Sequence, residues 1–390
     1  MRILHTSDWH LGKIVHGVHM TEQQEVVLEQ MLEDLERYRV DALVVAGDIY
    51  DRSVPPVEAV ELFNRTLTRV LRQTPVQKVF MISGNHDSPE RIGYGSGLFD
   101  ALGLHIGGKY EGDIRTVDWE DSSGPVRFHL FPFEIPQVIR ARLEDPEIRD
   151  YEDAWRAQMA AHAGRMDPGM RHVLVAHGFV SGSGEALTSE SERQLSIGGT
   201  ERISADVLKD FDYCALGHLH RAQQSAEGRV RYPGSLMRYS FSELDQENGG
   251  LLVELGPDGV AYTEKLSWKP RRELRRITGS LEELLSPAMD NKEREHYYQI
   301  VLTDKGALYD PISRLKAVYP NLLRLEREGF GPAVLPGQQD PDPDVEEISG
   351  DRMIRTFFSS VREEPLTESQ EAILEDLYAR LTRGEGGDAL

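Results

Sequence analysis

The chain has 390 residues, a formal net charge of −22 and one cysteine, Cys214. Its length allows two or three domains, its acidity argues against binding nucleic acid through bulk positive charge, and a lone cysteine excludes an internal disulfide. Apolar runs stay below the roughly 18 to 20 residues of a membrane span, and the N-terminus leads straight into a predicted strand, so we expect no signal peptide. We therefore expect a cytoplasmic protein without membrane contact, in which Cys214 is a buried thiol.

Five short apolar runs along the chain predict strands, and each run ends at Asp, Asn or His. Nearly unbroken apolar runs of this length are typical of strands buried on both faces. Sites in open α/β sheets form at the carboxyl ends of such strands, so the five endings predict one shared site. The runs and their endings are 2–7 with Asp8 and His10, 42–47 with Asp48, 79–84 with Asn85, His86 and Asp87, 173–176 with His177, and 214–217 with His218 and His220.

Between the strands the sequence predicts amphipathic helices, and this alternation indicates α/β layers. Thr21 and Gln24 have the spacing of a capping box at the start of the first helix, and Pro55-Pro56 opens a second one. Residues 181–200, rich in Ser and Gly, predict a long loop. The second helix is expected near 56–73, and a further helix is expected near 91–102. Beyond about residue 268 a small β-α-β-α-β module has strands at 271–277, 295–303 and 321–327 and helices at 280–286 and 310–318.

Composition divides the chain into a large domain (1–268), a small α+β domain (269–328), a Gly/Pro/Asp-rich linker (329–344) and a tail (345–390) with two amphipathic helices. Such helices have too little core to be stable alone. We expect the tail to pack on a separate partner, and the alternative is that it folds back on the large domain. A basic cluster opens the small domain. It would contact a phosphate backbone or form a solvated strand edge, and its members are Lys269, Arg271, Arg272, Arg275 and Arg276.

The residue types at the five endings suit hydrolysis of a phosphodiester by two metal ions, which requires a carboxylate shared between the ions. Asp48 is the natural bridge because it ends a predicted central strand. One ion would be completed by Asp8, His10 and His220, and the other by Asn85, His177 and His218. Mixed imidazole and oxygen ligands favour Mn, Fe or Zn over Mg. The remaining histidines are predicted to be structural, namely His5, His16, His19, His105, His129, His162, His172 and His296.

The ordered motifs resemble those of calcineurin-like metallophosphoesterases. They are Asp8-x-His10, Gly47-Asp48-x-x-Asp51, Gly84-Asn85-His86-Asp87, His177-Gly178 and Gly217-His218-x-His220. Within that superfamily the chain is similar, over essentially its whole length, to the SbcD family of nuclease subunits. The residues that narrow the choice are Thr6-Ser7-Asp8-Trp9-His10-Leu11-Gly12, Gly47-Asp48-Ile49-Tyr50-Asp51-Arg52, Gly84-Asn85-His86-Asp87-Ser88, Ala215-Leu216-Gly217-His218-Leu219-His220-Arg221 and Tyr232-Pro233-Gly234-Ser235.

The resemblance implies a fold and an assembly. The fold is an α/β one, with a four-layer α/β/β/α metallophosphoesterase core over 1–268, a small α+β capping domain for DNA over 269–328, and a helical tail over 345–390 that docks on an SbcC-type coiled-coil ATPase. The implied assembly is a homodimer within a heterotetramer, associated with the nucleoid.

The implied activity is Mn-dependent, with two Mn²⁺ ions. It comprises exonuclease cleavage of duplex DNA ends and endonuclease cleavage of single strands and hairpins, in repair, recombination and replication. By resemblance, His86 protonates or stabilises the leaving 3′ oxygen and Asp87 orients the His86 imidazole. Archaeal and eukaryotic relatives carry a second histidine where this chain has Asp51. Asp51, Arg52 and Arg221 are candidate substrate contacts, although Arg52 would equally pair with Asp51.

Two other functional classes compete with this interpretation. One is a phosphoesterase of another kind, such as a phosphoprotein phosphatase or a cyclic-nucleotide hydrolase. The basic cluster and the tail helices argue against it. The other is a non-catalytic scaffold, which a complete set of ligands together with His86 argues against.

Overall fold

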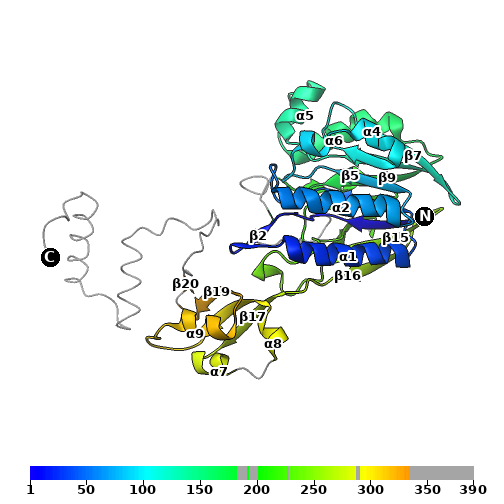
Figure 1. Cartoon of the computed structure of the whole chain (residues 1–390). Coiled ribbons are helices and arrows are strands. Elements are labelled where there is room, and N and C mark those ends of the chain that lie inside the picture. The colour runs from blue at the N-terminus through cyan, green and yellow to red at the C-terminus, as the bar shows by residue number, and fades with distance from the viewer. Residues whose placement is uncertain (182–190, 193–200, 226–227, 287–289, 330, 334–390) are drawn as a thin grey trace. The chain divides into compact units, whose positions relative to one another are not determined.

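In the computed structural model, residues 1–181, 191–192, 201–225, 228–286, 290–329 and 331–333 are described. They belong to two compact units, Met1–Leu274 and Arg275–Leu390, and Figure 1 labels their helices and strands. Most of the predicted loop at 181–200 and the two predicted tail helices lie outside the described residues. Among the described helices, none combines the length and the apolar character that crossing a membrane requires.

The first sheet contains three of the five predicted strands. Its strand order is β16-β15-β1-β4-β5-β6, and the predicted central strand, β4, lies inside it beside β1. Strands β1, β4, β5 and β6 run parallel, while β15 and β16 form an antiparallel edge. The bounds are β1 Arg2–Thr6, β4 Ala42–Ala46, β5 Lys78–Ile82, β6 Leu104–Gly107, β15 Gly249–Gly256 and β16 Gly259–Ser267.

The second sheet contains the other two predicted strands, β9 and β12, side by side. Its order is β13-β14-β12-β9-β8-β7, with parallel neighbours from β14 to β8 and antiparallel strands at both edges. The bounds are β7 Arg115–Asp121, β8 Gly124–Phe131, β9 Arg171–His177, β12 Tyr213–Gly217, β13 Gln223–Ser225 and β14 Val230–Tyr232.

The two sheets pack face to face through a shared apolar core. Side chains such as Ile3 and Val44 from the first sheet meet Val173 from the second. The rings of Phe80 and Phe128 stack across the interface with centroids 3.8 Å apart. Because helices cover the outer faces, these strands are buried on both sides, which explains their unbroken apolar sequence.

Helices complete the four α/β/β/α layers. Helices α1 (Thr21–Arg37) and α2 (Val57–Gln73) lie side by side along the strands of the first sheet (Figure 1). Helices α5 (Pro136–Leu143) and α6 (Tyr151–His162) pack on the second sheet, against a core that includes the buried Cys214. Shorter elements are the hairpin β2 (Ile14–Val15) and β3 (Val18–His19), the pair β10 (Val180–Ser181) and β11 (Ile203–Ser204), and the 3₁₀ turns η2 (Ala163–Arg165), η3 (Ala205–Leu208) and η5 (Phe241–Glu243).

The single helix predicted near 91–102 is wrong. The chain there forms three short pieces, α3 (Pro89–Ile92), α4 (Ser96–Phe99) and η1 (Asp100–Leu102). Gly93 and Gly95 separate the first two, and Gly95 adopts the left-handed conformation with φ of 72°. That conformation costs little for glycine and interrupts a helix.

The second unit has its own sheet and core. The strand order is β17-β18-β19-β20, and side chains such as Ile300, Leu315 and Leu325 pack together. Ser280 and Glu283 form a capping box at the start of the first helix. The predicted strands and helices are present, with α8 and β20 in addition. The bounds are β17 Leu274–Gly279, α7 Leu281–Leu285, α8 Asn291–Arg294, β18 Tyr297–Leu302, α9 Pro311–Val318, β19 Leu322–Arg327 and β20 Gly331–Ala333.

Candidate metal centre

The predicted ligands meet at one edge of the two packed sheets. Asp8 and His10 follow β1, Asp48 follows β4 and Asn85 follows β5. His177 is the last residue of β9, and His218 and His220 follow β12. Three overlapping sets have ligand atoms within 4.8 Å of one another, and they are Asp8 with His10 and His220, Asp8 with Asp48 and His177, and His10 with Asp48 and His86.

Sharp backbone turns direct these side chains inward. Asp8, His10, Asp48 and His218 have φ values of 51°, 44°, 50° and 106°, in a region that residues with a Cβ rarely adopt. Gly47, at φ of 85°, precedes Asp48, and a Cβ there would lie 2.4 Å from His177 Nδ1. The strained turns therefore bring side chains together that would otherwise continue along their strands.

The hydrogen bonds around the ligands fit bound cations. His177 Nδ1 donates to the carbonyl of Ala46 at 2.8 Å, so Nε2 is the ring nitrogen that remains for a metal ion. That atom faces two further acceptors, Asn85 Oδ1 at 2.9 Å and Asp48 Oδ2 at 3.5 Å. His10 Nε2 and His220 Nε2 also face each other at 3.1 Å, and the buried His10 Nδ1 has no hydrogen-bond partner among the described residues. A cation placed among such acceptors would satisfy them together.

The electrostatics favour the metal-binding protonation states at most positions. Burial lowers the pKa of His10, and it lowers that of His218 to about 3, so both rings are neutral. Burial opposes ionisation of Asp48, but His177 and His86 hold its pKa below the ordinary value. Deprotonated carboxylates and neutral imidazoles are the forms that bind metals.

Asp8 and His220 are the exceptions. Burial raises the pKa of the Asp8 carboxyl group, and the shift at His220 is caused by a residue that the sequence analysis missed. Burial acts to lower the pKa of His220, yet a hydrogen bond to Glu243 and its negative charge raise it to about 9. Glu243 Oε1 lies 2.9 Å from His220 Nδ1, and Glu243 is completely buried. It lies on η5, outside the strand endings that identified the ligands, so no local pattern marked it.

His86 and Asp87 lie beside the ligands, but their predicted relationship is wrong. His86 Nδ1 donates to the backbone carbonyl of Asp51 at 2.7 Å, so this carbonyl orients the imidazole. Asp87 instead accepts from the backbone N–H groups of Gly84, Ile49 and Tyr50 at 2.9 to 3.1 Å. Asp87 therefore ties together the two loops that carry Asp48 and Asn85, because its oxygens are taken by backbone donors.

Gln24 has a different role from the predicted capping box. Helix α1 begins at Thr21 and Met20 occupies the N-cap position, so the capping-box prediction is wrong. The buried Gln24 side chain reaches the loop after β1. Its Nε2 donates to the carbonyls of His10 and Trp9 at 2.8 and 3.2 Å, and its Oε1 accepts from Gly12 N. It therefore braces the loop that carries two of the predicted ligands.

The predicted substrate contacts form ion pairs on the chain itself. Asp51 pairs with Lys13 at 2.9 Å and with Arg52 at 3.7 Å. In this structure Arg52 therefore pairs with Asp51, which is one of the two roles predicted for it. Arg221 pairs with Asp245 at 2.6 Å. In the basic cluster, Arg271 pairs with Glu22 and Arg275 with Glu293. The histidines predicted to be structural include His129, which hydrogen-bonds to His162 and His172 in the core of the second sheet.

Known proteins resemble the chain over its whole length. The calcineurin-like phosphoesterase family matches residues 1–222, and the Type 5 capsule protein repressor C-terminal domain family matches residues 270–362. A relative from Staphylococcus epidermidis, named as the D subunit of the nuclease SbcCD, is 30% identical over 386 residues, which cover 99% of this chain and 100% of the relative. A relative of the same name from Staphylococcus saprophyticus is 31% identical and covers 98% of both chains.

The chain belongs to the SbcD family of calcineurin-like phosphoesterases. This membership confirms the resemblance seen in the sequence, and with it the four-layer core and a metal-dependent phosphodiester hydrolase. Among solved structures, TT1561 of Thermus thermophilus aligns with 68% of this chain and 98% of its own, at 15% identity and a TM-score of 0.39.

Proposed function

We propose that this protein is the nuclease subunit of an SbcCD-type complex and hydrolyses DNA phosphodiesters with two Mn²⁺ ions. The observation that carries the proposal is the convergence of lone pairs and carboxylates at one end of the two sheets. One ion would be held by Asp8, His10 and His220. The other would be held by Asn85, His177 and His218, with Asp48 between the two. Mixed imidazole and oxygen ligands favour Mn²⁺ over Mg²⁺.

Two bound cations would polarise the phosphate and lower the pKa of the attacking water. The protein residues then position and transfer protons. His86 keeps its Nδ1 proton on the Asp51 carbonyl, so Nε2 is the nitrogen available to the substrate. We infer that His86, when both ring nitrogens are protonated, gives its Nε2 proton to the leaving 3′ oxygen as a general acid and is left as a neutral ring with the proton on Nδ1. Asp87 holds the two loops on either side of this group and has no direct part in the proton transfer.

The family names of the relatives extend the proposal to substrates and partners. We propose exonuclease activity on duplex DNA ends, endonuclease activity on single strands and hairpins, and roles in DNA repair and recombination at the nucleoid. The second unit would be the DNA-facing capping domain. The tail over 345–390, which lies outside the described residues, would dock on an SbcC-type ATPase within a heterotetramer.

A nuclease assay tests the central claim. The full-length protein, freed of metal, is incubated with blunt duplex DNA and with a DNA hairpin, with and without Mn²⁺, and p-nitrophenyl phosphate is supplied in parallel. We expect Mn²⁺-dependent cleavage of both DNA substrates and weak turnover of the small ester. Efficient turnover of the small ester without DNA cleavage would assign the protein to another class of phosphoesterase.

We also propose that the protein forms a homodimer. Nine large hydrophobic side chains are exposed among the described residues, and six of them lie in two stretches near the start of α2 and around α4. Tyr94 and Leu98 are 82% and 79% exposed. Clusters of exposed apolar side chains often mark interaction sites, and these two stretches would form the contact between the subunits. The six residues are Val54, Val57, Val60, Tyr94, Leu98 and Leu102, and we call them the apolar surface.

A further inference from the structure

We propose that Glu243 is a positioning residue of the metal centre. Through His220 it would fix the orientation and the proton of one ligand, and so set the affinity of the ion that Asp8, His10 and His220 hold. This inference rests on the metal centre of the proposed function, and it is independent of which phosphodiester is cleaved.

Glu243 is held in one orientation by donors on both carboxylate oxygens. Its Oε1 lies 2.9 Å from His220 Nδ1 and also accepts from the hydroxyl of Ser191. Its Oε2 accepts from the backbone N–H of Tyr239 at 2.6 Å. A fully buried carboxylate is costly unless such partners satisfy it. Ser191 Oγ also lies 2.6 Å from His220 Nδ1. The arrangement therefore specifies a hydrogen bond from His220 Nδ1–H to the Glu243 carboxylate and to the Ser191 hydroxyl that this carboxylate holds.

This bond decides which nitrogen of His220 faces the metal site. A neutral imidazole carries one proton, and the carboxylate keeps it on Nδ1. The lone pair is then on Nε2, which lies 3.1 Å from His10 Nε2. A carboxylate behind a ligating histidine fixes the tautomer and the ring orientation and makes the nitrogen a stronger ligand.

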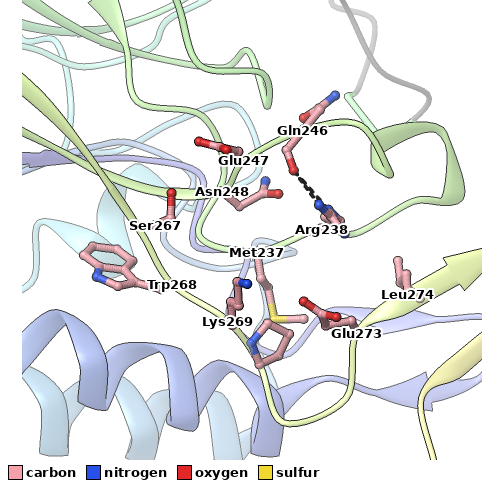
Figure 2. A pocket seen from close by; sticks show the side chains of 11 residues that line it. Met237, Arg238, Gln246, Glu247, Asn248, Ser267, Trp268, Lys269, Glu273 and Leu274 are labelled. Carbon is pink, nitrogen blue, oxygen red and sulfur yellow. Dashed lines mark hydrogen bonds between the residues drawn. The ribbon is translucent and has the colours of Figure 1, made fainter. Parts of the chain in front are cut away.

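A braced turn presents Glu243 to His220. Glu243 ends η5, and the N–H of Gln246 donates to its carbonyl at 2.9 Å. The guanidinium of Arg238 donates to the carbonyl of Gln246 at 3.1 and 2.7 Å, which closes the base of the turn (Figure 2). Nearby, Asn248 Nδ2 donates to Ser235 Oγ at 2.9 Å. The carboxylate is thus fixed by its own segment as well as by its partners.

The ligands of the other ion, Asn85, His177 and His218, form no hydrogen bond with Glu243 in the described part of the chain. Loss of Glu243 is therefore expected to affect the binding of one ion only. His177 keeps its Nδ1 proton on a neutral backbone carbonyl, that of Ala46. Removing the charge of Glu243 therefore leaves His177 and its neighbours unchanged. We expect loss of Glu243 to lower the affinity for one ion and to leave the affinity for the other unchanged. A purely structural role would lower the stability of the protein without this difference between the two sites.

A metal titration tests the proposal. Full-length wild type, Glu243→Gln and the matched control Glu247→Gln are freed of metal and titrated with Mn²⁺, and free Mn²⁺ is measured by electron paramagnetic resonance. Glu247 is an exposed carboxylate four residues further along the chain. We expect two sites in the wild type and the control. In Glu243→Gln one site should weaken by about 10- to 100-fold while the other keeps its affinity.

Unchanged affinities at both sites in Glu243→Gln would overturn the proposal. Failure of the wild type to bind Mn²⁺ would instead overturn the metal centre itself, so the two outcomes are distinct. Restoration of cleavage by Glu243→Gln at high Mn²⁺ would also support a role in affinity.

A second measurement needs no Glu243 variant and stays decisive if that variant fails to fold. In ¹⁵N-labelled wild type loaded with Zn²⁺, long-range ¹H–¹⁵N spectra report the tautomer of each histidine. The His220 signals are assigned by their absence in His220→Asn. We expect a proton on Nδ1 of His220. A His220 ring with its proton on Nε2 would overturn the proposal.

Discussion

Asp48 and His86 are neighbours in the site, but their proposed roles differ. Asp48 is shared by two of the ligand sets, with His177 in one and with His86 in the other. We expect Asp48→Asn to abolish hydrolysis and to weaken the binding of both ions, because this carboxylate would be shared between them. His86→Ala should lower the rate by about 10²- to 10⁴-fold, as for a lost general acid, while two metals remain bound. Elemental analysis of both variants separates the cases, and a metal lost from His86→Ala would make His86 a ligand.

Cys214 gives a second prediction for a single residue. It is buried in β12, and burial raises the pKa of its thiol far above the ordinary value. Because the thiolate is the reactive form, we expect a disulfide reagent at pH 8 to leave the native protein unmodified over an hour. In denaturant the same reagent should label one thiol per chain. Rapid labelling of the native protein would show that β12 opens readily.

The ligands were predictable from the sequence because each one ends an apolar strand, and a strand end is visible as a local pattern. Glu243 and Gln24 were not predictable in this way. Glu243 reaches His220 from a turn 23 residues away, and Gln24 reaches His10 from the first turn of helix α1. Both contacts depend on how distant segments pack, which no periodicity within either segment records.

At the scale of helices and strands, substitutions in the apolar surface test the proposed homodimer. We expect wild type to sediment as a dimer at low micromolar concentration. Tyr94→Glu and Leu98→Glu should each weaken association by about 2 kcal/mol or more, roughly 30-fold in Kd, because a charge would enter an apolar interface. Tyr309→Glu is the control, since Tyr309 is an equally exposed tyrosine in the second unit. A wild type that is monomeric across this range would contradict the proposal.

The bounds of the five strands that end at the candidate ligands were predicted to within two residues, whereas the helix at 91–102 was not predicted correctly. Strands such as β4 are buried on both faces, so their apolar runs begin and end where burial does. The segment at 91–102 has helix-compatible apolar spacing, but its glycines break it into short pieces. Backbone preference overrode side-chain periodicity there.

At the scale of the whole molecule, the tail can be tested by truncation after Pro341. We expect the shortened chain to lose co-purification with its ATPase partner and ATP-stimulated processing of duplex ends. Mn²⁺-dependent cleavage of single-stranded DNA should survive, because all the predicted ligands lie in the first unit. Normal binding of the ATPase by the truncated chain would show that the docking site lies elsewhere.

The two sheets contribute jointly to each proposed ion, and this makes the metals part of the tertiary structure. Asp8 and His10 come from the first sheet and His220 from the second, and the other ion spans the sheets in the same way. Each ion would act as a reversible cross-link whose strength follows the free metal concentration. Every tenfold rise in free Mn²⁺ above the Kd should add about 1.4 kcal/mol per site, or roughly 3 to 6 °C in Tm. A melting temperature that does not change with the concentration of free Mn²⁺ would contradict this prediction. With such a cross-link, the lifetime of the folded protein would itself be tied to the supply of metal.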